Sequence, residues 1–282
     1  HPTPMTTGYV SHDAMPIAPV GAPEAWDIEA DVVVVGTGMG GPTASTVASQ
    51  AGFKTVIVEK NPFIGGASAH SAINAALVGG SRKQVLNGYA WPGEACSIHE
   101  IVNKLNNVCQ QAVNLDLLRS CVIGSAVWLD WMQDTRKPGW ANVASRFAYP
   151  QIQDGTVGAL LGNQPALELL ARRTEEAGGQ VLVNTGCTAL VVEDGRVAGI
   201  KVTAPEKADA YHKANNGAIL TAGCFGMNLD PLEQYCPTAY MEATQGGPMP
   251  WATGECFRMG LGVGAGVSGF NSWGCWDGAA DE

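Results

Sequence analysis

The sequence lacks the long apolar runs and the basic clusters that mark two common kinds of partner. No apolar stretch approaches the roughly 20 residues that a membrane-spanning helix requires, so we expect no membrane span. Only 15% of the 282 residues are charged, and 16 basic against 26 acidic side chains give a formal net charge of −10. An acidic chain without a basic run argues against a nucleic-acid partner.

Metal-ligand and disulfide patterns are also absent. The eight cysteines form no CxxC pair and show no spacing typical of a metal site. Most of them stand in apolar segments, which favours small buried hydrophobic residues over disulfides or ligands. The sequence therefore predicts no metal site.

Residues 1–28 have no helical period and do not begin with methionine. This stretch is rich in proline, glycine and small polar residues, and it contains no signal peptide. We expect an extended N-terminal arm, left by processing or truncation, before a domain that spans residues 29–282. The expected location is the cytoplasm, and the alternative is export with the signal already removed.

A phosphate-binding turn is the most informative pattern in the chain. Four valines at 32–35 predict a buried parallel strand and run into the sequence GTGMGG. Gly36 permits a tight turn, Gly38 lets the backbone approach a pyrophosphate, and Gly41 lets the next helix lie close to the strand. The N-terminal amides of that helix would hold the phosphates.

A second predicted strand, TVIVE, ends at Glu59. A carboxylate at this point accepts hydrogen bonds from the ribose hydroxyls of adenosine, and it argues against a ribose that carries a 2′-phosphate. A glycine-rich turn alone can be purely structural. Because strand, turn, helix, strand and acid follow in order, the pattern predicts a dinucleotide site.

A segment of small residues follows the acid. Residues 61–77 read NPFIGGASAHSAINAAL, in which two adjacent glycines precede small hydroxyl residues. The amides and hydroxyls of an extended loop of this kind can face a planar ligand. This favours a flavin over a nicotinamide cofactor, and the alternative is an ordinary small-residue turn.

Further helices and strands are predicted from periodicity. Apolar spacing predicts two helices within 98–132 and an amphipathic helix over 164–177. Strand-like runs occupy 180–184, 187–193, 196–203 and 217–221, with Asp194-Gly195 as a hairpin turn between the second and third.

Four motifs in this order resemble the flavoprotein superfamily of fumarate reductases, succinate dehydrogenases and 3-ketosteroid dehydrogenases. They are GTGMGG with the EK that ends the second strand, FIGGASAHSAINAAL, GAILTAGCFGMN, and ATGECFRMGLGVGAGV. The resemblance implies an α/β fold: a Rossmann-like FAD-binding domain with a parallel sheet, helices and a small β-meander. The implied cofactor is FAD.

The resemblance also implies which residues bind FAD. Those at the pyrophosphate and the adenosine are Gly36, Gly38, Met39, Gly40, Gly41, Glu59 and Lys60, with Cys187 meeting adenine through its backbone. Those beside the isoalloxazine are Gly66, Ala67, Ser68 and Ser71. Those over the pyrophosphate and along the ribityl chain are Thr221, Ala222, Gly223, Thr253, Gly254 and Glu255.

Three departures from the family pattern stand near the flavin. Ala67 replaces the common asparagine or threonine, the double glycine expected before Ile73 is missing, and Glu255 replaces an aspartate. The loop beside the flavin is therefore expected to follow its own path. His70 is out of register for a covalent flavin link, so a histidine that lines the pocket or simply packs is favoured.

The resemblance implies two further parts that this sequence does not contain. In the family a capping domain and a C-terminal FAD segment complete the site, and they carry most substrate-binding and proton-delivering residues. We expect this chain to be one part of a two-chain or cleaved enzyme, a hetero-oligomer whose partner supplies both. No catalytic residue is assigned from the sequence.

The implied function is an FAD-dependent oxidoreductase acting on CH–CH or C=C bonds beside an activating carbonyl. Hydride would move to or from flavin N5, and another protein or a small acceptor would exchange the electrons. Trp273 and Trp276 suit a bulky apolar substrate, or else pack against the missing cap or a partner. The alternative function is a non-catalytic FAD-binding or assembly subunit. A nicotinamide-dependent dehydrogenase needs neither the segment 61–77 nor the last two motifs.

Overall fold

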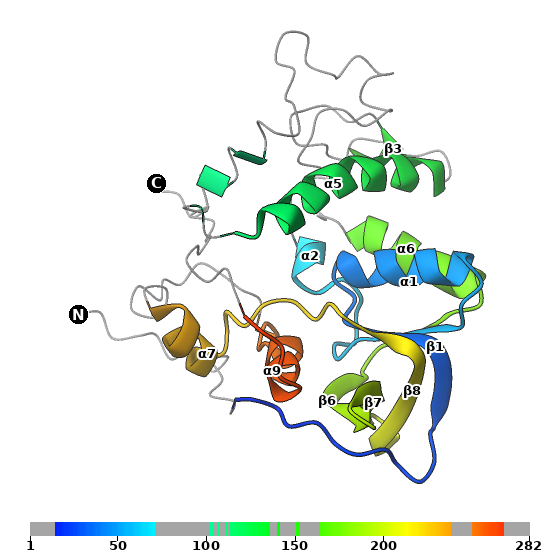
Figure 1. The fold of residues 1–282 in the computed structure, drawn as a ribbon. Helices are drawn as coiled ribbons and strands as arrows, with labels where there is room; N and C mark the ends of the chain where they lie inside the picture. The colour runs from blue at the N-terminus through cyan, green and yellow to red at the C-terminus, as the bar shows by residue number, and fades with distance from the viewer. Residues whose placement is uncertain are drawn as a thin grey trace. The chain divides into compact units, whose positions relative to one another are not determined.

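The computed structural model describes residues 15–70, 102–103, 106–107, 111, 113–135, 140–141, 151–152, 164–237 and 250–267. The chain divides into two compact units, one made of residues 1–70, 164–266 and 275–282 and the other of 71–163 and 267–274. The predicted residues Ser71, Ile73, Trp273 and Trp276 lie outside the described part of the chain. Figure 1 shows the described helices and strands of both units.

A six-stranded sheet in the order β5-β2-β1-β8-β7-β6 forms the first unit. Its strands are β1 (Ile28–Val35), β2 (Thr55–Val58), β5 (Gln180–Leu182), β6 (Gly186–Glu193), β7 (Arg196–Ala204) and β8 (Lys207–Leu220). The strands β5, β2, β1 and β8 run parallel, whereas β7 is antiparallel to both β8 and β6. The fold is therefore mixed α/β, with a parallel half and an antiparallel meander.

The centre of the parallel half consists of apolar strands that are covered on both faces. In β2 every side chain is buried, and in β1 the last three valines are at most 4% exposed. Such continuous apolar runs are typical of parallel strands between two layers. Val35 is in register with both Val58 and Leu220, so three strands end at one edge of the sheet. The residues that follow these three ends are Gly36, Glu59 and Thr221.

Two helices, α1 (Gly40–Gln50) and α6 (Gln164–Glu176), lie side by side on one face of this half (Figure 1). Their contact is polar: the Ser45 and Thr174 hydroxyls are 3.0 Å apart, and the Thr46 hydroxyl donates to the Leu170 carbonyl at 2.8 Å. These hydroxyl residues are buried. Because each of these three hydroxyls has a partner, small polar residues replace large apolar ones where the helices approach.

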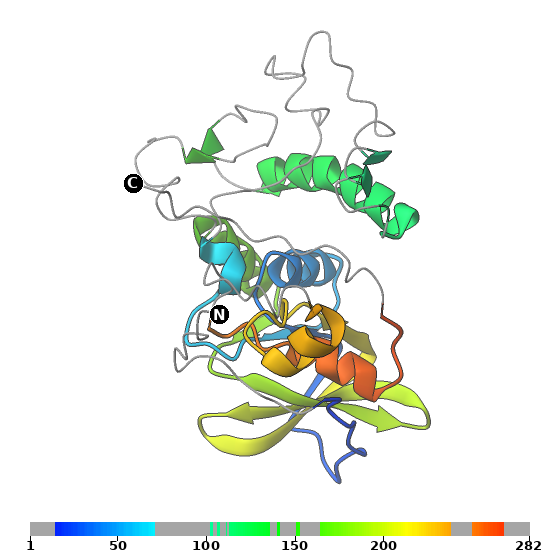
Figure 2. The same cartoon turned by 90° about the vertical axis from the view of Figure 1, so that its left-hand side faces the viewer.

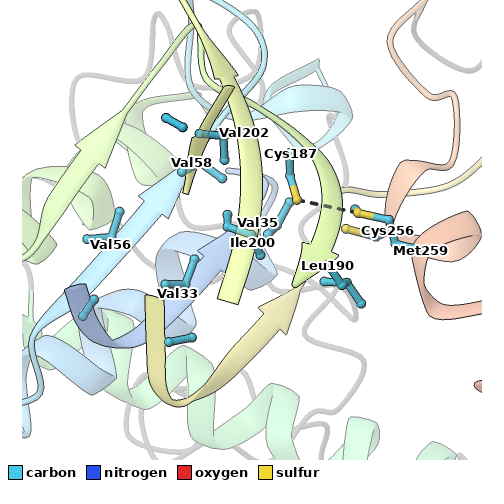
Figure 3. Packing of buried hydrophobic residues seen from close by; sticks show 13 residues of the cluster. Val33, Val35, Val56, Val58, Cys187, Leu190, Ile200, Val202, Cys256 and Met259 are labelled. Carbon is cyan, nitrogen blue, oxygen red and sulfur yellow. Dashed lines mark hydrogen bonds between the residues drawn. The ribbon is translucent and has the colours of Figure 1, made fainter. Parts of the chain in front are cut away.

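Helices α7 (Leu229–Tyr235) and α9 (Glu255–Gly262) lie side by side (Figure 2). The Tyr235 and Phe257 ring centroids are 5.2 Å apart. Helix α9 also contacts β6, where the Cys187 thiol lies 3.6 Å from the Met259 sulfur (Figure 3). Met259 is 1% exposed and joins the valines of β1 and β2 in one buried cluster. The core thus extends from the sheet to α9.

The hairpin prediction agrees with the structure, but the prediction for the last strand was too short. Asp194 and Gly195 have φ of 49° and 75° and connect β6 to β7, as a two-residue hairpin turn requires. The strand predicted at 217–221 is instead β8, which begins at Lys207. Its first part buries only alternate small or polar residues, namely Ala210, His212 and Ala214, so the apolar signal is weak.

The extended loop predicted over 61–77 was wrong at its centre, because residues Gly66–His70 form the short helix α2. Gly65, with φ of 114°, turns the chain, and the Ala69 amide donates to the Gly65 carbonyl at 3.1 Å. Ala69 is buried at 4% exposure. Small residues that can pack closely therefore favour a helical turn over an extended path here.

The described part of the N-terminal region, which starts at Met15, runs along β6 and α9. The Val20 amide donates to the Leu190 carbonyl of β6 at 2.9 Å, and the Val20 carbonyl accepts from the Val192 amide of β6 at 2.8 Å. The Ile17 amide donates to the Arg258 carbonyl of α9 at 3.1 Å. A Cβ at Gly262 would stand 1.8 Å from the Ile17 carbonyl oxygen, so only glycine lets the chain pass this closely.

Among the described residues of the second unit are one long helix, a short ribbon and the helical residues 102–103 and 106–107. Helix α5 (Leu115–Thr135) starts after Asn114, whose side chain accepts hydrogen bonds from the Asp116 and Leu117 amides. Strands β3 (Trp140–Ala141) and β4 (Gln151–Ile152) pair antiparallel. Within the residues described, no helix combines the length and hydrophobicity of a membrane span.

Candidate cofactor site

A groove opens where β1, β2 and β8 end, and all of its lining residues belong to the first unit. Segments far apart in the sequence meet there: the turn after β1, the start of α2, the end of β8 and the start of α9. The predicted residues that line it are Gly36, Gly38, Met39, Gly40, Glu59, Lys60, Gly66, Ala67, Ser68, Cys187, Thr221, Ala222, Gly223 and Glu255.

Three predicted residues do not line the groove but support those that do. A Cβ at Gly41 would lie 1.9 Å from the Gly36 carbonyl oxygen, so this glycine lets α1 approach the turn. Gly254, with φ of 77°, precedes α9 and packs against Phe225. The Thr253 hydroxyl donates to Glu255 at 2.7 Å.

Sequence reasoning missed eight lining residues: Val35, Thr37, Val58, Asn61, Thr185, Cys224, Trp251 and Ala252. Several of them are adjacent in the sequence to predicted residues, and this adjacency was the only signal in the sequence that could have identified them. Trp251 had none, because it stands before the first residue of the motif that begins at Ala252. Its ring lies 5.2 Å from that of Phe63, centroid to centroid.

The turn after β1 has the geometry needed to bind an anion. Gly36 has φ of 95°, and a Cβ on it would stand 2.7 Å from the Ala222 Cα, so the turn fits against the end of β8 only as glycine. Met39 at the start of α1 makes no side-chain cap, and the first turn of the helix holds no acidic residue. Helix amides in this arrangement favour a phosphate group.

Glu59 is 5% exposed and already accepts three hydrogen bonds from the protein. Its Oε2 accepts from the Thr37 amide at 3.0 Å and the Thr37 hydroxyl at 2.6 Å, and its Oε1 accepts from the Asn61 amide at 2.9 Å. A carboxylate offers about four acceptor positions. One therefore remains for a donor in the groove, such as a ribose hydroxyl.

A second carboxylate, that of Glu255, lines the groove at the start of α9. Its Oε1 accepts from Lys60 at 2.6 Å and from Thr253, whereas its buried Oε2 has no hydrogen-bond partner in the structure. Burial alone would raise the pKa of Glu255, but the hydrogen bond and charge of Lys60, with Thr253, lower it below the ordinary value. The carboxylate is thus ionised and needs a donor.

The cysteines that the structure describes differ in exposure. Cys187 and Cys256 are buried, whereas Cys224 at the groove and Cys121 on α5 are exposed. The interpretation as buried hydrophobic residues is therefore wrong for the last two. Burial raises the pKa of the Cys187 thiol and raises that of Cys256 to about 11. No cluster of possible metal ligands occurs among the residues that the structure describes.

The features of the groove fit FAD. The uncapped start of α1 suits a pyrophosphate, Glu59 has one acceptor position left, and the Glu255 oxygen without a partner suits a hydroxyl beyond the phosphates. A turn, an acid and a second acid in one groove define a dinucleotide-binding module of the flavin type. The model of the family "FAD binding domain" matches residues 31–276, and the chain belongs to this family.

The chain is similar to several known reductases and dehydrogenases. The chain is 28% identical to the digoxin reductase of Eggerthella lenta over 226 residues, which are 73% of this chain and 37% of that protein. The 3-ketosteroid-Δ4-(5α)-dehydrogenase structure from Rhodococcus jostii RHA1 has a TM-score of 0.68, at 24% identity over 89% of this chain and 57% of the other. A flavocytochrome c3 fumarate reductase has a TM-score of 0.71, at 23% identity over 86% of this chain and 42% of the other.

These comparisons confirm the superfamily of fumarate reductases and 3-ketosteroid dehydrogenases, and FAD as its cofactor. The chain spans little more than a third of the digoxin reductase. The two solved structures, at 24% and 23% identity, show that the chain shares their fold.

Proposed function

We propose that this chain is the FAD-binding part of an oxidoreductase that moves a hydride between FAD and a carbon–carbon bond beside a carbonyl. The observation that carries the proposal is the single groove shared by the turn at Gly36, helix α2, the end of β8 and the start of α9. A nicotinamide site needs only the first of these. When bound, FAD supplies the hydride chemistry, and the chain binds and orients it.

The residues of the chain divide this binding between two ends of the groove. The turn at Gly36 and the start of α1 would hold the pyrophosphate, and Glu59 the adenosine ribose. Glu255 would accept a hydroxyl of the chain that links the phosphates to the flavin ring. The start of α2, at Gly66–Ser68, would lie beside the ring.

The substrate side is proposed to come from further polypeptide. A partner chain that carries a cap domain and a C-terminal FAD segment would complete the site. A bulky apolar substrate is proposed because that relative is named for digoxin reduction and a similar structure contains 4-androstene-3,17-dione. Electrons would be exchanged with another protein or a small acceptor.

The visible spectrum of the purified protein tests the cofactor and the reaction in turn. We expect flavin absorption, with FAD released on denaturation. With the completing polypeptide present, bleached flavin should be reoxidised by a 3-ketosteroid or an enoate. A colourless protein that retains NAD would contradict the cofactor assignment. A bound flavin that never responds to substrate would instead indicate a non-catalytic FAD-binding subunit.

A further inference from the structure

The Lys60 side chain joins two parts of the groove that are nearly 200 residues apart. Its ammonium group donates to the Trp251 carbonyl at 2.6 Å, the Thr253 hydroxyl at 3.0 Å and Glu255 Oε1 at 2.6 Å. Lys60 directly follows Glu59 at the end of β2, whereas the three acceptors lie at or just before the start of α9. One ammonium group thus fastens the start of α9 to the edge of the sheet.

All the hydrogen-bonding capacity of Lys60 is used in this contact. A lysine ammonium has three N–H donors, and the protein itself supplies three acceptors. No donor remains for a phosphate or a sugar hydroxyl. The structure therefore argues against Lys60 as a direct cofactor ligand, although its place after Glu59 suggests that role.

The contact fixes which oxygen of Glu255 is available. Glu255 lines the groove, and its Oε1 accepts hydrogen bonds from Lys60 and Thr253. Its Oε2 is therefore the oxygen without a hydrogen-bond partner. An ionised carboxylate only accepts hydrogen bonds, and a buried acceptor without a partner is costly. The group that satisfies Oε2 must therefore be a donor.

We propose that Lys60 is a positioning residue for FAD: it holds Glu255 so that Oε2 accepts a hydrogen bond from a polyol hydroxyl of FAD, beyond the pyrophosphate. This inference rests on the proposed function only for the identity of the ligand. The inference predicts different effects on FAD and ADP binding, because ADP contains the adenosine and pyrophosphate but lacks the polyol that Glu255 would bind.

The test compares FAD and ADP binding to the flavin-free protein by calorimetric titration. Lys60→Met removes all three hydrogen bonds, and we expect FAD to bind about 10- to 100-fold more weakly while ADP affinity changes less than about threefold. Lys60→Arg, which keeps the charge, should recover part of the FAD affinity. Lys201→Met is the matched control, because Lys201 on β7 has an ion pair with Asp209 on β8 and does not line the groove, so both affinities should stay unchanged.

A second variant keeps the test decisive if Lys60→Met folds poorly. Glu255→Gln is close in shape and removes the charged acceptor, so it should weaken FAD but not ADP. Where Lys60→Met is well folded, combining it with Glu255→Gln should cost little more than Glu255→Gln alone, because Lys60 acts through Glu255.

Equal losses of FAD and ADP affinity would overturn the inference, as would unchanged FAD affinity or fully additive losses in the double variant. Wild-type protein that binds FAD but lacks turnover when the completing polypeptide is present would count against the proposed reaction alone. Wild-type protein that does not bind FAD would overturn both.

Discussion

Thr37 donates two hydrogen bonds to one oxygen of Glu59, from its amide at 3.0 Å and from its hydroxyl at 2.6 Å. The same hydroxyl accepts a hydrogen bond from the Gly65 amide at 2.9 Å. One threonine therefore connects the turn after β1, the acid after β2 and the glycine that precedes α2. It orients the carboxylate from the protein side and leaves the groove side for a ligand.

Thr37→Val tests this connection. The substitution keeps the shape but leaves the Gly65 amide without its acceptor and Glu59 without one donor, so we expect a loss of about 1–3 kcal/mol in the free energy of unfolding. Chemical denaturation with and without FAD measures it. Thr188→Val is the control, because its exposed hydroxyl makes only a long 3.3 Å hydrogen bond, and it should change stability by no more than about 0.5 kcal/mol. Equal effects of the two would contradict the assignment.

Gly41→Ala tests the close approach of α1 to the turn. Because the new Cβ would stand 1.9 Å from the Gly36 carbonyl oxygen, turn and helix must separate. We expect destabilisation at the upper end of about 1–3 kcal/mol or beyond, with loss of bound FAD. Absorbance of the purified variant and its melting temperature report both. A Cβ at Gly21 would meet nothing within 4 Å, so Gly21→Ala should behave as wild type.

The sequence was sufficient to predict the parts of the fold whose signal is local. The turn at Gly36, the hairpin at Asp194-Gly195 and helix α6 each follow from a short pattern. Helix α2 and the full length of β8 could not be predicted, because their small residues show no clear period and their conformation depends on packing. The Lys60 contact was equally invisible, since it joins segments nearly 200 residues apart.

Thiol labelling should report occupancy of the groove. Cys224 is exposed and lines the groove, and Cys121 is exposed on α5 in the other unit. A maleimide at pH 8 should label both, and FAD should slow labelling of Cys224 only. Buried Cys256, with its pKa raised to about 11, should react slowly in either state. Peptide mass mapping gives each rate, and protection of neither thiol would argue against FAD in this groove.

His212 should make stability depend on pH. It is 3% exposed, and burial lowers its pKa below 6.5, while the charge of Asp27 opposes this. The unfolded chain therefore binds the proton first, and stability falls as pH drops below about 6.5, by at most about 1.4 kcal/mol per pH unit.

Melting temperatures between pH 5 and 8 measure this dependence. In His212→Gln the slope below pH 6.5 should be shallower than in wild type, because the other titrating groups are common to both proteins. Parallel curves would show that the pKa of His212 is the same in the folded and unfolded states and would contradict this prediction.

The register of the sheet has a consequence for the order in which the protein can mature. Strand β1 lies between β2 and β8, yet Thr221, which follows β8, is 186 residues beyond Val35. During synthesis on the ribosome, β1 can pair with β2 early, but its other neighbour, β8, is made only after more than 170 further residues. An unpaired apolar edge is prone to aggregation during that interval. FAD insertion is therefore expected only after synthesis has passed Glu255, and nascent chains are expected to need chaperone protection until then.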